Sequence, residues 1–205
     1  MRSSVRLAAF TAFAALAFPA VSGAQGIGAA ITPYAGYLVP GNLYDGPLGT
    51  SLTTSNAPMV GAQASIPISK GIALIGNLAY ASGDLRVGLP VLGGINVGTA
   101  RTFFYDAGLE LGGLAGRSTG IKPFVQGGVG GMTSDVKNGL VTVHSTNIAY
   151  SAGVGVDIGV SKGFALRVQA KDWIGRFDSQ EAVGFRVNGN LAHNWALTAG
   201  IKLAF

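Results

Sequence analysis

Apolar residues alternate with small or polar residues near the C-terminal end of the chain. Between residues 195 and 205 every second position is apolar, at Trp195, Leu197, Ala199, Ile201, Leu203 and Phe205. The positions between them hold alanine, threonine, glycine and lysine. Because successive side chains of a strand point to opposite faces, the pattern predicts a strand with one apolar face and one small or polar face.

The same period of two recurs along the chain and predicts about eight strands of roughly ten residues each. The expected strands cover residues 31–39, 58–66, 72–81, 102–111, 121–133, 148–160, 164–173 and 195–205. Two Ser-Lys-Gly tripeptides, at residues 69–71 and 161–163, predict tight turns. Long connections are expected at residues 40–57, 82–101, 134–147 and 174–194, and they alternate with short ones.

These elements predict an all-β fold, an eight-stranded antiparallel up-and-down transmembrane β-barrel. The main alternative has ten strands, because Val183, Phe185 and Val187 alternate ahead of an Asn-Gly turn signal. Charged residues fall on the rows opposite the apolar rows; Arg167 and Lys171, for example, alternate with apolar side chains of residues 164–170. A soluble barrel would show the same alternation with its faces exchanged, so the pattern alone does not say which face is inside.

The N-terminal segment and the composition favour lipid on the outside. Arg2 and Arg6 precede an apolar run at residues 7–18, and Ser22-Gly23-Ala24 offers small residues to a signal peptidase. We therefore expect residues 1–24 to be a cleaved secretory signal and residues 25–205 to form the barrel domain. Charged residues make up only 11% of the chain, against about 25% in ordinary soluble domains. The absence of cysteine excludes a lipoprotein anchor and disulfides.

Three segments resemble the bacterial outer-membrane β-barrel family, in particular its small eight-stranded OmpA/OmpX-type members. They are Pro33-Tyr34-Ala35-Gly36-Tyr37, residues 122–130 (KPFVQGGVG) and residues 197–205 (LTAGIKLAF). The resemblance implies an outer-membrane location, contact with outer-membrane lipids, insertion by the barrel assembly machinery and a monomeric state. It also implies that the last strand is an assembly signal, carried by Trp195, Leu197, Ile201, Leu203 and Phe205. No periplasmic domain is expected after the barrel.

Seven charged residues are expected to point into the barrel. They are Asp106, Glu110, Lys122, Asp157, Arg167, Lys171 and Lys202. Because eight strands enclose a space that side chains can just fill, a charge-paired plug is favoured over a polar conduit. The glycines of the inward rows keep the conduit open as an alternative, since they leave space that water could occupy. An aromatic girdle at the two membrane interfaces is expected from Tyr150, Phe164, Trp173 and Trp195.

No residue pattern carries convincing chemistry. The segment His144-Ser145-Thr146-Asn147 is a faint echo of a lipid A deacylase signature, with threonine at the nucleophile position. His193 is the other histidine, and both are expected in or beside loops. We expect no catalytic, cofactor or metal site and no nucleic-acid partner. The predicted role is structural, in envelope integrity or surface contact; the alternatives are a narrow pore or carrier, and an envelope-lipid-modifying enzyme.

Overall fold

The computed structural model describes residues 28–41, 44–45, 51–89, 93–113, 120–138, 141–176 and 191–205. The expected signal segment, residues 1–24, and the alternating stretch at residues 183–187 lie outside the described residues. Apart from the two short strands described below, the described chain is almost entirely long antiparallel strands.

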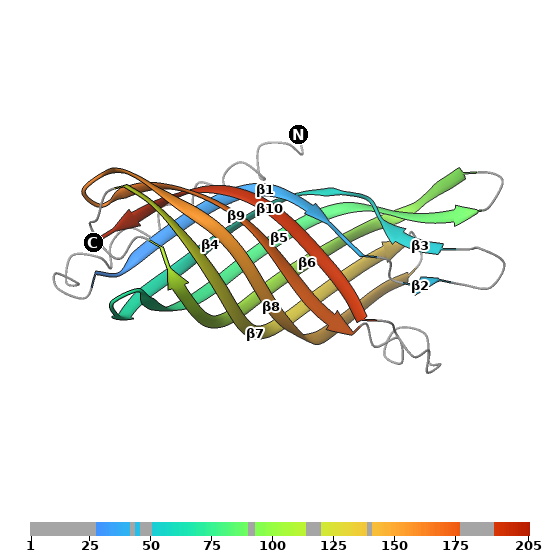
Figure 1. Ribbon diagram of the computed structural model, residues 1–205. Coiled ribbons are helices and arrows are strands. Elements are labelled where there is room, and N and C mark those ends of the chain that lie inside the picture. The colour runs from blue at the N-terminus through green and yellow to red at the C-terminus, as the bar shows by residue number, and fades with distance from the viewer. Residues whose placement is uncertain are drawn as a thin grey trace, which may run out of the picture.

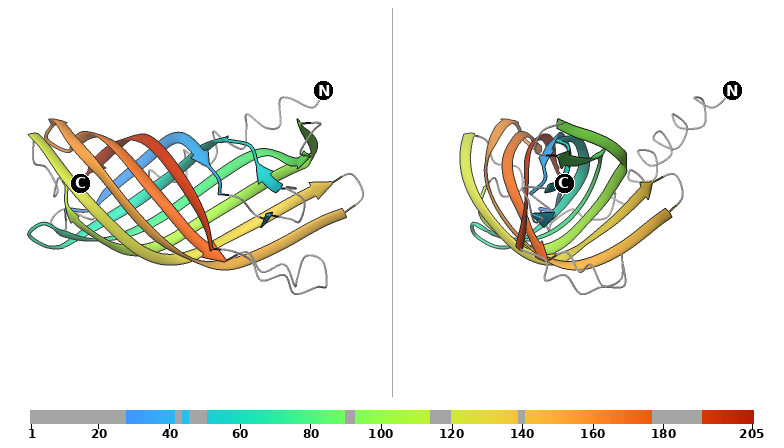
Figure 2. Two further views of the ribbon diagram at one scale, coloured as in Figure 1. Left: turned by 45° about the vertical axis from the view of Figure 1, so that its right-hand side comes forward. Right: turned by 90° about the vertical axis from the view of Figure 1, so that its right-hand side faces the viewer.

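Eight long strands close into one antiparallel barrel, seen from the side in Figure 1 and along its axis in the right-hand view of Figure 2. Neighbours follow chain order, β4 pairs with β1, β1 pairs with β10, and β5 pairs with β6 to complete the ring. The strands are β1 (Ala30–Val39), β4 (Ala57–Ser69), β5 (Ile72–Leu89), β6 (Gly93–Gly112), β7 (Gly120–Asn138), β8 (Val141–Ser161), β9 (Phe164–Arg176) and β10 (Leu191–Ala204). The prediction of an eight-stranded up-and-down barrel is therefore confirmed.

Two short strands extend the sheet beyond the barrel wall. β3 (Ser51–Thr54) pairs with the far part of β5, and β2 (Tyr44–Asp45) pairs with β3. Both lie at the same end of the barrel, on the right in Figure 1. They come from the connection expected at residues 40–57, not from the stretch that motivated the ten-stranded alternative.

The two predicted Ser-Lys-Gly turns lie at one end of the barrel, which we call the short-turn rim. Gly71 and Gly163 adopt φ values of +78° and +86°, which favour glycine. The Gly71 carbonyl accepts a hydrogen bond from the Gly112 amide at 2.8 Å, and the Gly163 carbonyl accepts one from the Ala204 amide at 2.9 Å. Each turn is thus tied to an adjacent strand. We call the opposite end the hairpin rim.

Two long loops expected from the sequence are largely strand. β5 and β6 stay paired as far as Leu89 and Gly93, and β7 and β8 stay paired as far as Asn138 and Val141. The expectation of loops at residues 82–101 and 134–147 was wrong for this reason. In a hairpin, backbone N–H and C=O groups form hydrogen bonds whether or not the side chains alternate. Beyond a bilayer neither face of a strand has to be apolar, so the alternation of apolar and polar residues becomes weaker there.

The barrel has a polar interior and an apolar exterior. The buried side chains include Asp106, Glu110, Asp157, Arg167 and Lys171, whereas leucine, isoleucine, valine and aromatic side chains are exposed along the outer rows of every long strand. This distribution inverts that of a soluble barrel and is the one expected where lipid surrounds the wall. Among the described residues, no helix is long and apolar enough to cross a membrane.

Candidate functional site

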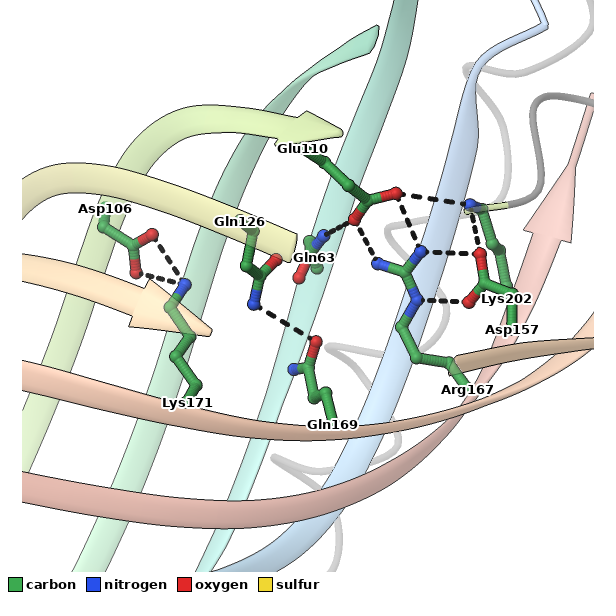
Figure 3. A network of polar contacts seen from close by, with 9 residues as sticks. All are labelled: Gln63, Asp106, Glu110, Gln126, Asp157, Arg167, Gln169, Lys171 and Lys202. Atoms are coloured by element: carbon green, nitrogen blue, oxygen red, sulfur yellow. Dashed lines mark hydrogen bonds and ion pairs between the residues drawn. The ribbon is translucent and has the colours of Figure 1, made fainter. Parts of the chain in front are cut away.

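A charge network fills the lumen toward the short-turn rim, and its centre is Arg167 of β9 (Figure 3). Its guanidinium donates to both oxygens of Glu110, at 2.7 and 3.0 Å, and to both oxygens of Asp157, at 2.7 and 2.8 Å. Lys202 Nζ lies 2.9 Å from Asp157 Oδ2, and Gln63 Nε2 donates to Glu110 at 3.2 Å. Paired bidentate contacts of this kind fix both carboxylates in place as well as neutralising them.

A second network lies further toward the hairpin rim and converges on Asp106 of β6. Lys171 Nζ donates to its two oxygens at 2.7 and 3.0 Å, and Trp173 Nε1 donates at 3.0 Å. Ser151 and Asn77 add hydrogen bonds at 3.1 and 3.2 Å. Both oxygens of this carboxylate are therefore satisfied by groups from four other positions around the barrel.

The charges of the two networks inside the lumen balance. Glu110, Asp157 and Asp106 supply three acids, and Arg167, Lys171 and Lys202 supply three bases, each no more than 6% exposed. Gln126 and Gln169 lie between the two networks and are joined by a hydrogen bond of 3.3 Å (Figure 3). Buried charges are tolerated when they are paired and hydrogen-bonded, and this equality leaves none of the six without a counter-charge.

An apolar layer covers the second network on the side of the hairpin rim. The rings of Phe104 and Trp173 pack with centroids 4.8 Å apart. Around them lie Leu38, Met59, Met132 and several alanines, all buried. The lumen thus holds two polar layers and one apolar layer along its length. Because the side chains of these layers have almost no accessible surface, they leave no room beside them for a water molecule.

The inward-facing glycines do not leave open space. At Gly155 a Cβ would come within 2.5 Å of the Phe124 ring, and at Gly153 it would come within 2.8 Å of Gln126 Nε2. The Phe124 ring itself lies 4.1 Å from the Arg167 guanidinium. Large neighbours therefore occupy the volume that these glycines release, and the water-filled conduit suggested by the glycine content is not what the geometry favours.

Two of the residues expected from the sequence lie elsewhere. Lys122 has the inward orientation on β7, but it is exposed at the short-turn rim, because Phe124 on the same row takes the place against Arg167. Trp173 does not belong to an outer girdle: it is 1% exposed and bonded to Asp106. It follows Lys171 by two positions, and residues two apart on a strand share a face.

The other expected outer residues do face outward. Tyr150 and Trp195 are exposed, and Phe164 is partly exposed beside the turn at the short-turn rim. Of the residues expected to carry an assembly signal on β10, Leu197 and Ile201 are exposed, while Leu203 and Phe205 are partly buried. Strand alternation could also have identified Gln169 and Phe104 as interior, since they share rows with Arg167 and Asp106.

The two histidines were expected in or beside loops. Both lie within strands, β8 for His144 and β10 for His193, and the His144 side chain is outside the described part. His193 Nδ1 lies 2.6 Å from Asp172 Oδ2. Within the described residues, no group of three or more His, Cys, Asp or Glu side chains could hold a metal ion.

Comparison with solved structures gives the fold. OprG, an outer-membrane protein of Pseudomonas aeruginosa, aligns with a TM-score of 0.62 at 12% identity over 87% of this chain and 96% of its own. Neisserial surface protein A aligns with a TM-score of 0.58 at 13% identity over 86% of this chain and 97% of its own. The chain has the fold of a small eight-stranded outer-membrane barrel. The resemblance drawn from the sequence is confirmed at that level.

A third neighbour of this barrel is the outer-membrane protein AlkL, whose structure was determined in lipid bilayers. It aligns with a TM-score of 0.56 at 15% identity over 92% of this chain and 95% of its own. No protein-family model matches the sequence. A search of curated proteins finds no match either. These neighbours support an outer-membrane location, and at such low identity they carry the fold and not a role.

Proposed function

We propose that this chain is a non-conducting, non-enzymatic barrel of the outer membrane with a structural role, in envelope integrity or in surface contact through its hairpin rim. The observation that carries the proposal is the balanced, buried charge network centred on Arg167 and Asp106. A barrel whose interior is filled by paired charges and an apolar layer is stable and holds its two rims in fixed positions.

The pore alternative is disfavoured by the same interior. Ions crossing the lumen would have to break the bidentate contacts of Arg167 with Glu110 and Asp157 and also displace the Phe104–Trp173 layer. Opposite charges in a poorly hydrated space attract strongly, so a transient opening there carries a large penalty. Among the described side chains, we find no nucleophile that is oriented by a neighbouring base, so an enzymatic role has no support from the geometry.

Export and orientation complete the proposal. Residues 1–24 have the character of a signal peptide, so the exported chain begins at Gln25. The short-turn rim faces the periplasm and the hairpin rim faces outward, in keeping with the short periplasmic turns of this class. The barrel is inserted by the barrel assembly machinery, contacts lipid over its apolar wall and acts as a monomer without a nucleic-acid partner.

Envelope permeability in cells tests the proposed role. Deleting the gene for this protein should make the cells more sensitive to a large antibiotic that an intact outer membrane excludes. Returning the wild-type gene should restore their resistance. Complementation with a folded variant altered only in exposed residues of the hairpin rim, such as Asp84→Ala, separates integrity from surface contact. Loss of cell attachment without loss of resistance would assign the role to surface contact; unchanged permeability and attachment on deletion would contradict the proposal.

A further inference from the structure

One carboxylate–imidazole pair lies on the outer wall of the barrel and takes no part in the interior networks. Asp172 is on β9 between Lys171 and Trp173, and both of these neighbours reach Asp106 inside the lumen. Because side chains alternate along a strand, Asp172 points outward. His193 lies on the outward row of β10 that also contains exposed Trp195 and Leu197. A buried carboxylate and an exposed imidazole thus lie on the outer face of the barrel wall.

The pair is held in a defined geometry. His193 Nδ1 lies 2.6 Å from Asp172 Oδ2, and the Asp172 side chain is 5% exposed whereas that of His193 is 48% exposed. The backbone of His193 is also confined, since a Cβ at Gly41 would come within 2.5 Å of its carbonyl oxygen. The Asp172 carboxylate therefore holds the Nδ1 side of the imidazole ring in place, while the rest of the ring stays partly exposed.

The pair lies at the level of the outer membrane interface. Asp172 is in register with Trp195, the aromatic residue of β10 expected in the girdle. The rise of a tilted strand places it roughly 20 Å from Phe164 at the short-turn rim, and the apolar band of such barrels is about 25 Å tall. His193 lies further still toward the hairpin rim, so its free edge meets lipid headgroups and not acyl chains.

The pair also differs from the interior ion pairs in being incompletely satisfied. Every carboxylate oxygen of Asp106 has a donor, whereas Asp172 Oδ1 is buried and has no hydrogen-bond partner among the described protein atoms. A carboxylate on a lipid-facing row is costly, and its unpartnered oxygen adds to that cost unless a hydrogen-bond donor from outside the protein reaches it.

The geometry points to a binding subsite for the phosphate group of an outer-leaflet lipid at His193, with Asp172 as its positioning residue. In the protonated ring both nitrogens donate. With Nδ1 directed to Asp172, Nε2–H is left to donate to a phosphate oxygen, a charge-assisted hydrogen bond. Trp195 lies beside the site, where its ring can pack along the same lipid. The inference requires the barrel to lie in a membrane, but it does not require a closed lumen.

Trp195 provides the assay. Protein extracted from membranes carries the Trp173→Phe substitution, so that Trp195 is the remaining tryptophan, and is reconstituted in phosphatidylcholine vesicles. Quenching by brominated phosphatidic acid is compared with quenching by brominated phosphatidylcholine. We expect the phosphate monoester lipid to be preferred at this position by roughly fivefold, which corresponds to about 1 kcal/mol. His193→Gln and Asp172→Asn should reduce the preference to about one.

The controls decide between a specific site and its alternatives. Tyr80→Phe alters an exposed tyrosine on β5, remote from β9 and β10 in the ring, and should leave the preference unchanged. Folding of each variant is checked by its heat-dependent mobility in detergent gels. Equal quenching by the two lipids in the Trp173→Phe protein would overturn the inference, as would a preference that survives both site variants. Loss of the preference in excess inorganic phosphate, but not in sodium chloride of equal ionic strength, would show that the site takes the phosphate group itself. Loss in both salts would mean nonspecific attraction to a charged membrane and would overturn the inference.

Discussion

The two tryptophans lie on opposite faces of the barrel wall. Trp173 is 1% exposed and donates to Asp106, whereas Trp195 is 53% exposed on the outer wall. Alternation from Lys171 places Trp173 inside, and this could be read from the sequence. A general preference of tryptophan for membrane interfaces suggested the opposite. The hydrogen bond from Trp173 to Asp106, 67 positions earlier in the chain, could not be predicted from the sequence, because it depends on how the strands close into a barrel.

Quenching by lipids with brominated acyl chains should separate the two tryptophans. In Trp195→Phe the remaining emission comes from Trp173, and we expect it to be nearly insensitive to brominated lipid because the barrel wall lies between. In Trp173→Phe the emission of Trp195 should be strongly quenched. Comparable quenching of the two variants would contradict the interior position of Trp173.

Arg167 should contribute more to stability than any exposed base. In Arg167→Ala two buried carboxylates, Glu110 and Asp157, retain Lys202 as their shared counter-charge, and breaking a buried ion pair in this way typically costs about 3–5 kcal/mol. The matched control Lys162→Ala removes an exposed lysine from a short turn and should change the free energy of unfolding by less than about 0.5 kcal/mol. Urea unfolding in vesicles measures both.

The double variant Arg167→Met with Glu110→Gln sharpens this test. It removes one base and one acid together, so Asp157 and Lys202 remain as a balanced pair. We expect it to be more stable than Arg167→Ala, since a stranded charge is worse than a neutral pair of similar volume. A double variant less stable than Arg167→Ala would mean that the network does not act through charge balance.

At the scale of elements, β10 shows what the sequence predicts well. Its alternation between residues 195 and 205 gives the correct register, with Lys202 directed to Asp157 and Leu197 exposed on the outer wall. The far ends of β5 to β8 were missed, since strands beyond the bilayer need no continuous apolar row, and the short alternation of Leu85, Val87 and Leu89 on β5 was not recognised. The period-two pattern therefore predicts the part of each strand that meets lipid, and not the full length of the strand.

Depth along β10 should set the effect of a charge on the outer wall. Leu197→Arg puts arginine near the middle of the apolar band, where it costs roughly 2–4 kcal/mol, whereas Leu203→Arg lies near the short-turn rim and should cost less. Lys202→Leu disturbs the interior and should lower stability without preventing contact with lipid. Free energies of unfolding in vesicles test this order, and a larger loss for Leu203→Arg than for Leu197→Arg would contradict the proposed position in the bilayer.

At the scale of the whole molecule, three layers close the lumen: the Arg167 network, the Asp106 network and the apolar layer of Phe104 and Trp173. All six charged members of the two networks were predicted from the sequence, and the width of an eight-stranded barrel predicted that they would meet. Their pairing depended on long-range contacts, and so did the exclusion of Lys122 by Phe124. We therefore propose that the rims and outer wall of this barrel, and not its lumen, meet other molecules.

Single-channel recording of the wild-type protein in a planar bilayer tests the closed lumen most directly. The barrel should insert, as shown by protection of its strands from added protease, and produce no steady current at moderate voltage in concentrated salt. Reproducible stepwise currents that scale linearly with voltage and persist for seconds would contradict the account, because ions would then pass through space that the structure fills with Arg167, Lys171, Trp173 and their partners.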